Sequence, residues 1–366
     1  MVIELIEQST LSNALLTIPS ELEGLVDESY IVDTLAQPRA EELIRYHGNP
    51  VLQPIPEHSW ESKYVLNAGA IKLGRKVYML YRAYGDDEIS RIGLAISEDG
   101  YYFNERLEKP IFEPGHETEN KGCEDPRLTL LGNQIYMTYT AYDGIVAQIA
   151  IASISVNDFL KFDWESWQRL GLFLPGCNNK DAFIFPEQFD SKVVMVHRIE
   201  PHIWITFSSE ISCPWPSGCH KILAKPSAGS KWDSEKIGAG AQPLKTKYGW
   251  LLITHGVDRS KVYRLGVMLL DLFNPTILIY RSPNFILEPS TRWELGNNGE
   301  YWVPNVVFTC GAIPLENGKD LLEANDEIIV YYGGADTVMN IATARVGALI
   351  PEEIRDRQYI NQTINS

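Results

Sequence analysis

The turn Glu124-Asp125-Pro126-Arg127 is the segment of this sequence whose residue types best suit a chemical role. Pro126 fixes its own φ, so we expect the two acids to be held at the entrance of the following strand rather than in a mobile loop. A rigidly held carboxyl group suits general acid catalysis. The alternative is structural, with Asp125 capping the turn beside an ion-pairing Arg127.

Basic side chains interrupt or adjoin apolar β-rich runs further along the chain. They are Lys180, Arg198, Lys245 and His255. An unpaired charge in such a run is costly unless it meets an anion. Together these side chains could donate charge-assisted hydrogen bonds to a phosphate group. The alternative is that each pairs with a neighbouring acid, such as Asp181 or Glu200.

Aromatic side chains are available to complete a sugar site. The candidates are Tyr84, Tyr142, Tyr263 and Trp302. Sugar rings stack their C–H faces on flat side chains, while their hydroxyl groups bond to polar residues. The alternative for each of the four is packing inside a β-rich core.

A repeat in the sequence indicates how the fold brings these distant residues together. Each copy is a β-rich run, a turn and a second run that ends in small or apolar residues. The copies begin at VYMLYRAYG (Val77 to Gly85), IYMTYTAYDG (Ile135 to Gly144), VVMVHRIEP (Val193 to Pro201), WLLITHGVD (Trp250 to Asp258) and IIVYYGGAD (Ile328 to Asp336). Equivalent positions in the first four copies lie 58, 58 and 56 residues apart.

Five such copies predict an all-β fold, a five-bladed β-propeller. Four-stranded blades bury their faces only by stacking radially around a channel. A sandwich of two sheets would explain the short strands but not the nearly constant spacing. In a propeller, the candidate residues from different copies would converge at one mouth of the channel.

The ends of the chain differ from the repeats. Within residues 1–48, apolar positions around Leu22 to Val26 and Ala40 to Ile44 suit short amphipathic helices. We expect this extension to pack on the propeller or on a second subunit of a homo-oligomer. Residues 49–350 form the predicted catalytic propeller and residues 351–366 a C-terminal tail.

Composition excludes several classes of protein. The 366 residues carry a net charge of −16, which disfavours nucleic acid and anionic membranes as partners. The first residues are acidic rather than basic, and no charge-free apolar run reaches bilayer length, so we expect a cytoplasmic protein. The five scattered cysteines form no CxxC pair, so neither a disulfide framework nor a zinc site is predicted.

The order of motifs along the chain resembles glycoside hydrolase family 130. The motifs are NAG (Asn67 to Gly69), YRAYG (Tyr81 to Gly85), SRIGLAISEDG (Ser90 to Gly100), EDPR (Glu124 to Arg127), FPE (Phe185 to Glu187), HR (His197, Arg198), PLKT (Pro243 to Thr246), GWLLITHGV (Gly249 to Val257), YRLGVMLLDL (Tyr263 to Leu272) and YYGGADT (Tyr331 to Thr337). The similarity runs from about Asn49 to Val346.

The resemblance implies an inverting β-mannoside phosphorylase with a five-bladed propeller. Such an enzyme converts a short β-1,2- or β-1,4-linked mannoside and inorganic phosphate to α-mannose 1-phosphate and a shortened acceptor, without a metal or organic cofactor. Asp125 would be the general acid and would pass its proton through the mannose 3-hydroxyl. The implied substrate-binding residues are Asn67, Arg82, Asp336, Glu124 and Arg127. The implied phosphate-binding residues are Lys180, Arg198, Lys245, His255 and Tyr263.

A single catalytic carboxyl group is chemically sufficient for this reaction. An inverting glycosidase needs a second carboxylate to activate water, whereas phosphate is already a nucleophile. A phosphorylase therefore needs one acid and a group of cations on the opposite face of the sugar. Two other functions stay open: a β-mannoside hydrolase of the same fold, with Glu200 as its candidate base, and a mannoside-binding propeller without catalysis.

Overall fold

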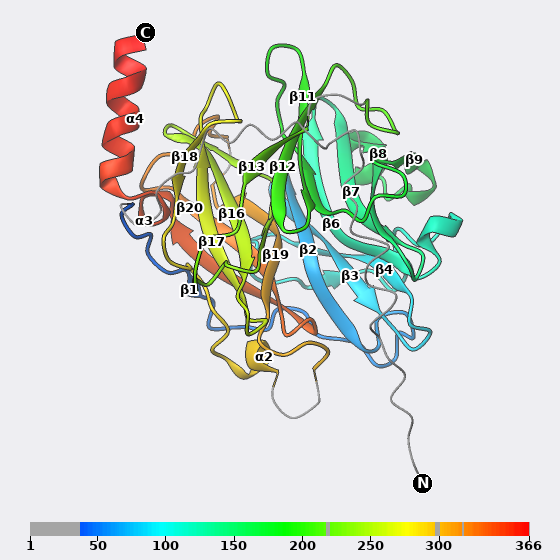
Figure 1. Ribbon diagram of the computed structural model, residues 1–366. Helices are drawn as coiled ribbons and strands as arrows, with labels where there is room; N and C mark the ends of the chain where they lie inside the picture. Colours follow the sequence, from blue (N-terminus) through cyan, green and yellow to red (C-terminus); the bar gives the residue numbers. More distant parts are fainter. Residues whose placement is uncertain (1–36, 217–219, 297–300, 317, 366) are drawn as a thin grey trace, which may run out of the picture.

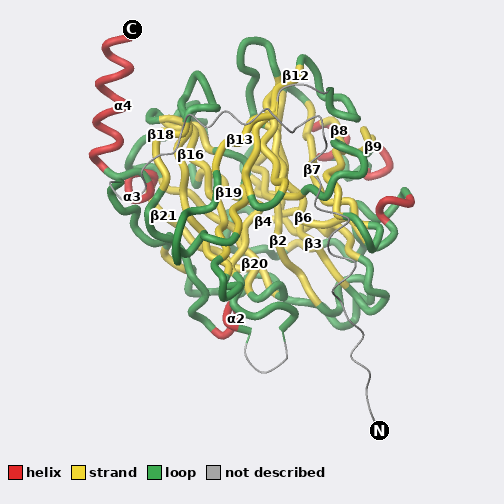
Figure 2. Tube along the Cα trace, viewed as in Figure 1, coloured by secondary structure: helices red, strands yellow, loops and turns green. Residues whose placement is uncertain are grey.

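Strands make up most of the regular structure in the computed structural model, as Figure 2 shows. The structure describes residues 37–216, 220–296, 301–316 and 318–365. The predicted all-β class is therefore confirmed. Within those residues, no helix has the length and apolar character needed to cross a membrane.

The strands form five antiparallel units, of which the first two share one sheet. Unit 1 contains β2 (Tyr64–Leu73), β3 (Lys76–Tyr84), β4 (Ser90–Ser97) and β5 (Glu105–Arg106). Unit 2 contains β6 (Gly122–Leu131), β7 (Gln134–Tyr142), β8 (Ala147–Ser155) and β9 (Gln168–Leu172). A parallel pair between Ser90 and Gly122 joins the two units.

The remaining units are separate sheets. Unit 3 contains β10 (Lys180–Ile184), β11 (Val193–Ile199), β12 (His202–Ser208) and β13 (His220–Ala224). Unit 4 contains β14 (Lys236–Ala239), β15 (Leu244–Thr246), β16 (Gly249–Val257), β17 (Tyr263–Leu270) and β18 (Leu278–Arg281). Unit 5 contains β19 (Val307–Pro314), β20 (Glu327–Gly334), β21 (Val338–Arg345) and, from the other end of the chain, β1 (Ile44–Arg45).

The first strands of successive units contact one another. β2 contacts β6, β6 contacts β10, and β10 contacts β14. In unit 5, β19 contacts β16 and β17 of unit 4 on one side and β2 of unit 1 on the other. The series of contacts between units thus returns to its starting strand, β2.

Three of the units share a buried cluster of one glutamate, one tyrosine and one arginine. In unit 1, Glu61 accepts a hydrogen bond from the Tyr81 hydroxyl (2.8 Å) and pairs with Arg106. The equivalent sets are Glu119, Tyr139 and Arg169 in unit 2, and Glu294, Tyr332 and Arg45 in unit 5. Because a buried carboxylate is stable only when paired and hydrogen-bonded, each cluster fixes the loop that carries its glutamate onto the unit.

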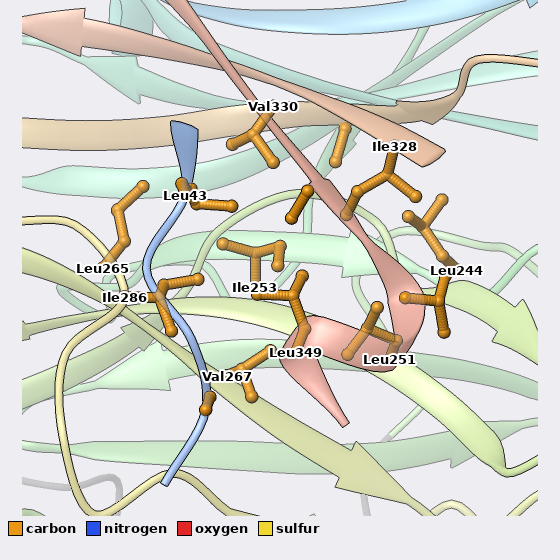
Figure 3. Packing of buried hydrophobic residues seen from close by; sticks show 14 of the residues in the cluster. Leu43, Leu244, Leu251, Ile253, Leu265, Val267, Ile286, Ile328, Val330 and Leu349 are labelled. Carbon is orange, nitrogen blue, oxygen red and sulfur yellow. The ribbon is translucent and has the colours of Figure 1, made fainter. Parts of the chain in front are cut away.

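The helix predicted around Ala40 to Ile44 is wrong. This segment is extended: the backbone N–H of Leu43 donates to the Ile286 carbonyl (2.8 Å), and β1 pairs with β21. Leu43 packs in the core beside Ile286 and Leu349, as Figure 3 shows. Tertiary pairing thus overrides the local helical pattern. The other predicted helix, around Leu22 to Val26, lies outside the described residues.

Helices are short except at the C-terminus. The predicted C-terminal tail contains α4 (Glu352–Asn365), which extends away from the strands in Figure 1. The other helical segments are α1 (Val156–Leu160), α2 (Arg292–Leu295), α3 (Val346–Leu349) and the 3₁₀ turns η1 (Glu117–Glu119) and η2 (Trp164–Ser166).

Candidate active site

The first strands of units 1, 2 and 3 are interrupted at equivalent positions by a shift of register. At each interruption one residue adopts a positive φ: Asn67 (51°), Asp125 (52°) and Asp181 (58°). Asn and Asp tolerate this left-handed conformation better than other residues with a side chain. All three side chains line one cavity, so the bulges are the local feature that places polar groups at the centre of the molecule.

That cavity has a volume of about 470 Å³. The predicted site residues that line it are Asn67, Arg82, Asp125, Lys180, Arg198, Tyr263 and Asp336. Glu124, Arg127, Lys245 and His255 do not line it. The cavity also contains Glu200, the candidate base for hydrolysis, and Asp181, a candidate ion-pair partner. Asn178, Asn179 and Lys236 line it as well and were not assigned to the site.

A single carboxyl oxygen of Asp125, Oδ1, accepts both hydrogen bonds made to its side chain. Asn67 Nδ2 donates to Oδ1 at 2.9 Å, and Arg82 Nη1 donates to the same atom at 3.4 Å. Among the described residues, Oδ2 receives no hydrogen bond. The side chain is therefore oriented by two donors on Oδ1, while Oδ2 is left for a ligand in the cavity.

Glu124 lies behind the cavity wall and pairs with two of the cavity's cations. Its Oε1 accepts from Arg82 Nη2 (2.9 Å), and its Oε2 accepts from Lys180 Nζ (3.3 Å). Burial alone would lower the pKa of Lys180, but Glu124 and Asp125 outweigh burial and raise it. Lys180 is therefore charged at neutral pH, and Glu124 holds two of the cavity's cations in place.

Asp181 sits between two arginines. Arg198 Nη1 lies 2.7 Å from Oδ2, and Arg127 Nη2 lies 3.0 Å from Oδ1. Burial opposes ionisation, yet Arg198 and its neighbours hold the pKa of Asp181 well below its usual range. Arg127 is almost completely buried and also donates to the Gly240 carbonyl (2.7 Å), so it serves as a counter-ion behind the cavity.

Lys236 is a cation of the cavity that the sequence analysis missed. It opens β14, and its Nζ donates to Glu200 Oε1 at 2.9 Å. Arg198 Nη2 lies 3.3 Å from the same oxygen. Arg198 from unit 3 and Lys236 from unit 4 thus share one exposed carboxylate at the cavity wall. The available signal was a lysine at the start of the glycine-rich apolar run Ile237 to Gly240.

The structure does not bring Lys245 to the cavity. On β16, Lys236 is paired with Val257 and Lys245 with Trp250, at the two ends of the same strand. Seven residues of strand separate these positions by roughly 20 Å. Lys245 pairs instead with Glu187 and lies over the Trp250 ring. The sequence analysis expected Lys245 beside the other cations, but the register of unit 4 places it away from them.

His255 is not one of the cavity's cations either. It is fully buried behind Arg198, with its Nε2 3.2 Å from Arg198 Nη1. Burial lowers the pKa of His255 to about 3, so the imidazole is neutral at physiological pH. His255 therefore supports the Arg198 guanidinium from behind instead of adding positive charge.

The predicted aromatic residues divide into two groups. Tyr142 and Tyr263 line the cavity. Tyr84 and Trp302 do not, but the Trp302 ring lies against the Arg82 guanidinium, 5.1 Å from its carbon to the ring centroid. In the described part of the chain, no group of three or more His, Cys, Asp or Glu side chains is placed to hold a metal ion.

The titration of Asp336 predicts how the free energy of unfolding changes with pH. Burial raises its pKa to about 7, although Arg82 opposes the shift. Between about pH 4 and pH 7 the folded chain retains a proton that the unfolded chain has lost. The free energy of unfolding should therefore fall as pH rises through this window, by at most about 1.4 kcal/mol per pH unit.

Urea denaturation at pH 5 and pH 7 tests this prediction. The Asp336→Asn variant lacks the titrating carboxyl group. Its free energy of unfolding should therefore fall less than that of the wild type between pH 5 and pH 7. An identical loss in both proteins would show that Asp336 titrates near its ordinary pKa.

Comparison with known proteins places the chain among phosphorylases. A family model described as beta-1,4-mannooligosaccharide phosphorylase, of glycoside hydrolase family 130, matches residues 35–351. A 1,2-beta-oligomannan phosphorylase from Thermoanaerobacter sp. (strain X514) is 40% identical over 82% of this chain and 96% of that protein. A beta-1,2-mannobiose phosphorylase from the same organism is also 40% identical, with the same coverage. The structure of a beta-1,2-mannobiose phosphorylase from Listeria innocua, solved with beta-1,2-mannobiose, superposes with a TM-score of 0.70 at 27% identity, covering 87% of this chain and 99% of that one.

Proposed function

Because this chain belongs to glycoside hydrolase family 130, we propose that it is an inverting phosphorylase that cleaves a short β-1,2-linked mannoside with inorganic phosphate. The two relatives at 40% identity, both named for β-1,2-linked substrates, favour this linkage over β-1,4. The observation that carries the proposal is one cavity that holds both Asp125 and the cations Lys180, Arg198 and Lys236.

The five units are proposed to form a five-bladed β-propeller with this cavity at one mouth of its channel. The series of contacts from β2 through β19 and back to β2 supports this arrangement. The catalytic propeller is proposed to span about residues 49–350, together with β1, which completes unit 5. A cytoplasmic location belongs to the same proposal and is supported by the free thiols of the four described cysteines.

In the proposed mechanism, the mannosyl unit binds beside Asn67, Arg82 and Asp336. Phosphate binds against Lys180, Arg198 and Lys236, where positive charge offsets its own negative charge. A phosphate oxygen forms a bond to the anomeric carbon while the glycosidic C–O bond breaks. The proton of Asp125 reaches the departing oxygen through the mannose 3-hydroxyl. The products are α-mannose 1-phosphate and the shortened acceptor.

Hydrolysis is the second candidate function, because Glu200 lines the same cavity. Burial alone would raise the pKa of Glu200, but Arg198 and Lys236 lower it. The carboxylate is therefore ionised and chemically able to activate a water molecule. Its two ion pairs, however, make Glu200 a weaker base, and the cations Arg198 and Lys236 suit a phosphate group, which favours phosphorolysis.

A phosphate-dependence assay tests the proposed function. β-1,2-Mannobiose incubated with the protein should give α-mannose 1-phosphate, detected by phosphorus and proton NMR, only when phosphate is present. β-1,4-Mannobiose in parallel reports the linkage preference. Release of free mannose at a rate that phosphate does not change would establish hydrolysis instead.

A further inference from the structure

We infer that Tyr64, Tyr84 and Trp302 form a platform at the rim of unit 1 that binds the acceptor sugar, the part of the substrate beyond the scissile bond. This inference rests on the proposed function and locates a binding surface outside the cavity. The three aromatic side chains are called the aromatic platform below.

The Trp302 indole of the aromatic platform packs against both tyrosines and Arg82 and stays partly exposed. The Trp302 ring lies 4.8 Å from the Tyr64 ring, at 12° between planes, and 4.7 Å from the Tyr84 ring. The two tyrosine rings are only 5.8 Å apart, too close for the indole to lie between them. The tyrosines therefore do not sandwich Trp302, which also contacts the Arg82 guanidinium and is 36% exposed.

The local structure explains why this group is rigid. Tyr64 and Tyr84 are directly opposed across the first pair of β2 and β3, so their rings stand on the same face of the sheet. The backbone N–H of Trp302 donates to Thr337 Oγ1 at 3.0 Å, which ties the Trp302 loop to the turn that carries Asp336. A rigid aromatic surface binds a sugar with little loss of side-chain entropy.

The aromatic platform adjoins the residues proposed to hold the mannosyl unit. Arg82 links the two, because its guanidinium lies against Trp302 and also donates to Asp125. A sugar that extends out of the cavity on this side would meet an exposed indole. Pyranose rings present C–H faces that stack on such aromatic surfaces.

The line of nucleophilic attack also places the acceptor sugar on the side of the aromatic platform. In an inverting displacement the nucleophile and the leaving group are roughly in line on opposite faces of the sugar. The cations Arg198 and Lys236 put phosphate at the boundary between units 3 and 4. In a ring of five units, unit 1 lies opposite that boundary. The leaving sugar therefore departs toward β2 and β3, which carry Tyr64 and Tyr84.

An assay in the synthetic direction measures the KM for the acceptor separately from the KM for the donor. With α-mannose 1-phosphate as donor and mannose or β-1,2-mannobiose as acceptor, Trp302→Ala should raise the KM for acceptor about 10-fold. The KM for α-mannose 1-phosphate should change less than twofold, because that molecule occupies only the cavity. Trp302→Phe keeps a flat ring and should stay within about threefold of the wild type.

Phe273→Ala is the matched control, since Phe273 is 76% exposed in the loop between β17 and β18 and should leave both constants unchanged. An unchanged acceptor KM in Trp302→Ala would overturn the inference. An equal rise of both KM values would also overturn it, because it would show that Trp302 only holds Arg82. If instead the wild type makes no product in either direction, the proposed function itself fails, a result distinct from both.

Discussion

Replacing Asp125 with Asn should lower kcat on β-1,2-mannobiose by about 10³-fold, within the range that general acid catalysis contributes. The amide keeps the size of the side chain and its oxygen can still accept from Asn67 and Arg82, so the cavity should keep its shape. It cannot, however, supply a proton to the departing oxygen. Initial rates of α-mannose 1-phosphate formation measure the effect.

An activated substrate distinguishes the acid role from a binding role. The leaving group of 2,4-dinitrophenyl β-mannoside departs as a stable anion and needs no proton, so Asp125→Asn should lose less than about 10-fold on it. Asp320→Asn, a change at an exposed loop position, serves as the control and should behave as the wild type. An equal loss on both substrates would reject Asp125 as the proton donor.

Replacing Lys236 with Met should raise the KM for phosphate about 30-fold. A hydrogen bond between charged groups contributes about 1.5–3 kcal/mol, which corresponds to roughly 10- to 150-fold in affinity. The fold should survive, because Glu200 is an exposed residue and keeps its contact with Arg198. Initial rates at varied phosphate and saturating mannobiose give the KM.

Lys245 provides a matched control within the same unit. Lys245→Met removes the same charge from the opposite end of β16 and should leave the KM for phosphate within twofold of the wild type. The KM for mannobiose should change little in either variant. The assignment of Lys236 would be wrong if the two variants behaved alike, or if Lys236→Met acted on mannobiose instead of phosphate.

The sequence predicted the part of the site that depends on local chain geometry. Asp125 directly precedes a proline at the start of a strand, so it could be assigned before its bulge was seen. Arg198 could be found in the same way, because it occupies a polar position within an otherwise apolar strand. These assignments need only the order of residues along single strands.

The errors arose where the answer depends on pairing between strands or on burial. Unit 4 has two short strands, β14 and β15, on one side of β16, and only their register separates Lys236 from Lys245. His255 was counted as a cation because its sequence position does not reveal that burial keeps its imidazole neutral. The pattern around Leu43 suggested a helix because its partner strand lies about 300 residues away.

The pairing of β1 with β21 affects when the protein can finish folding. β1 leaves the ribosome about 300 residues before β21, with which it pairs. Arg45 likewise pairs with Glu294, which lies 249 residues further along the chain. Such long-range pairing slows folding, since the ends must meet before the contact is gained. The first four units can thus form one after another during translation, but unit 5 can be completed only after β21 has emerged.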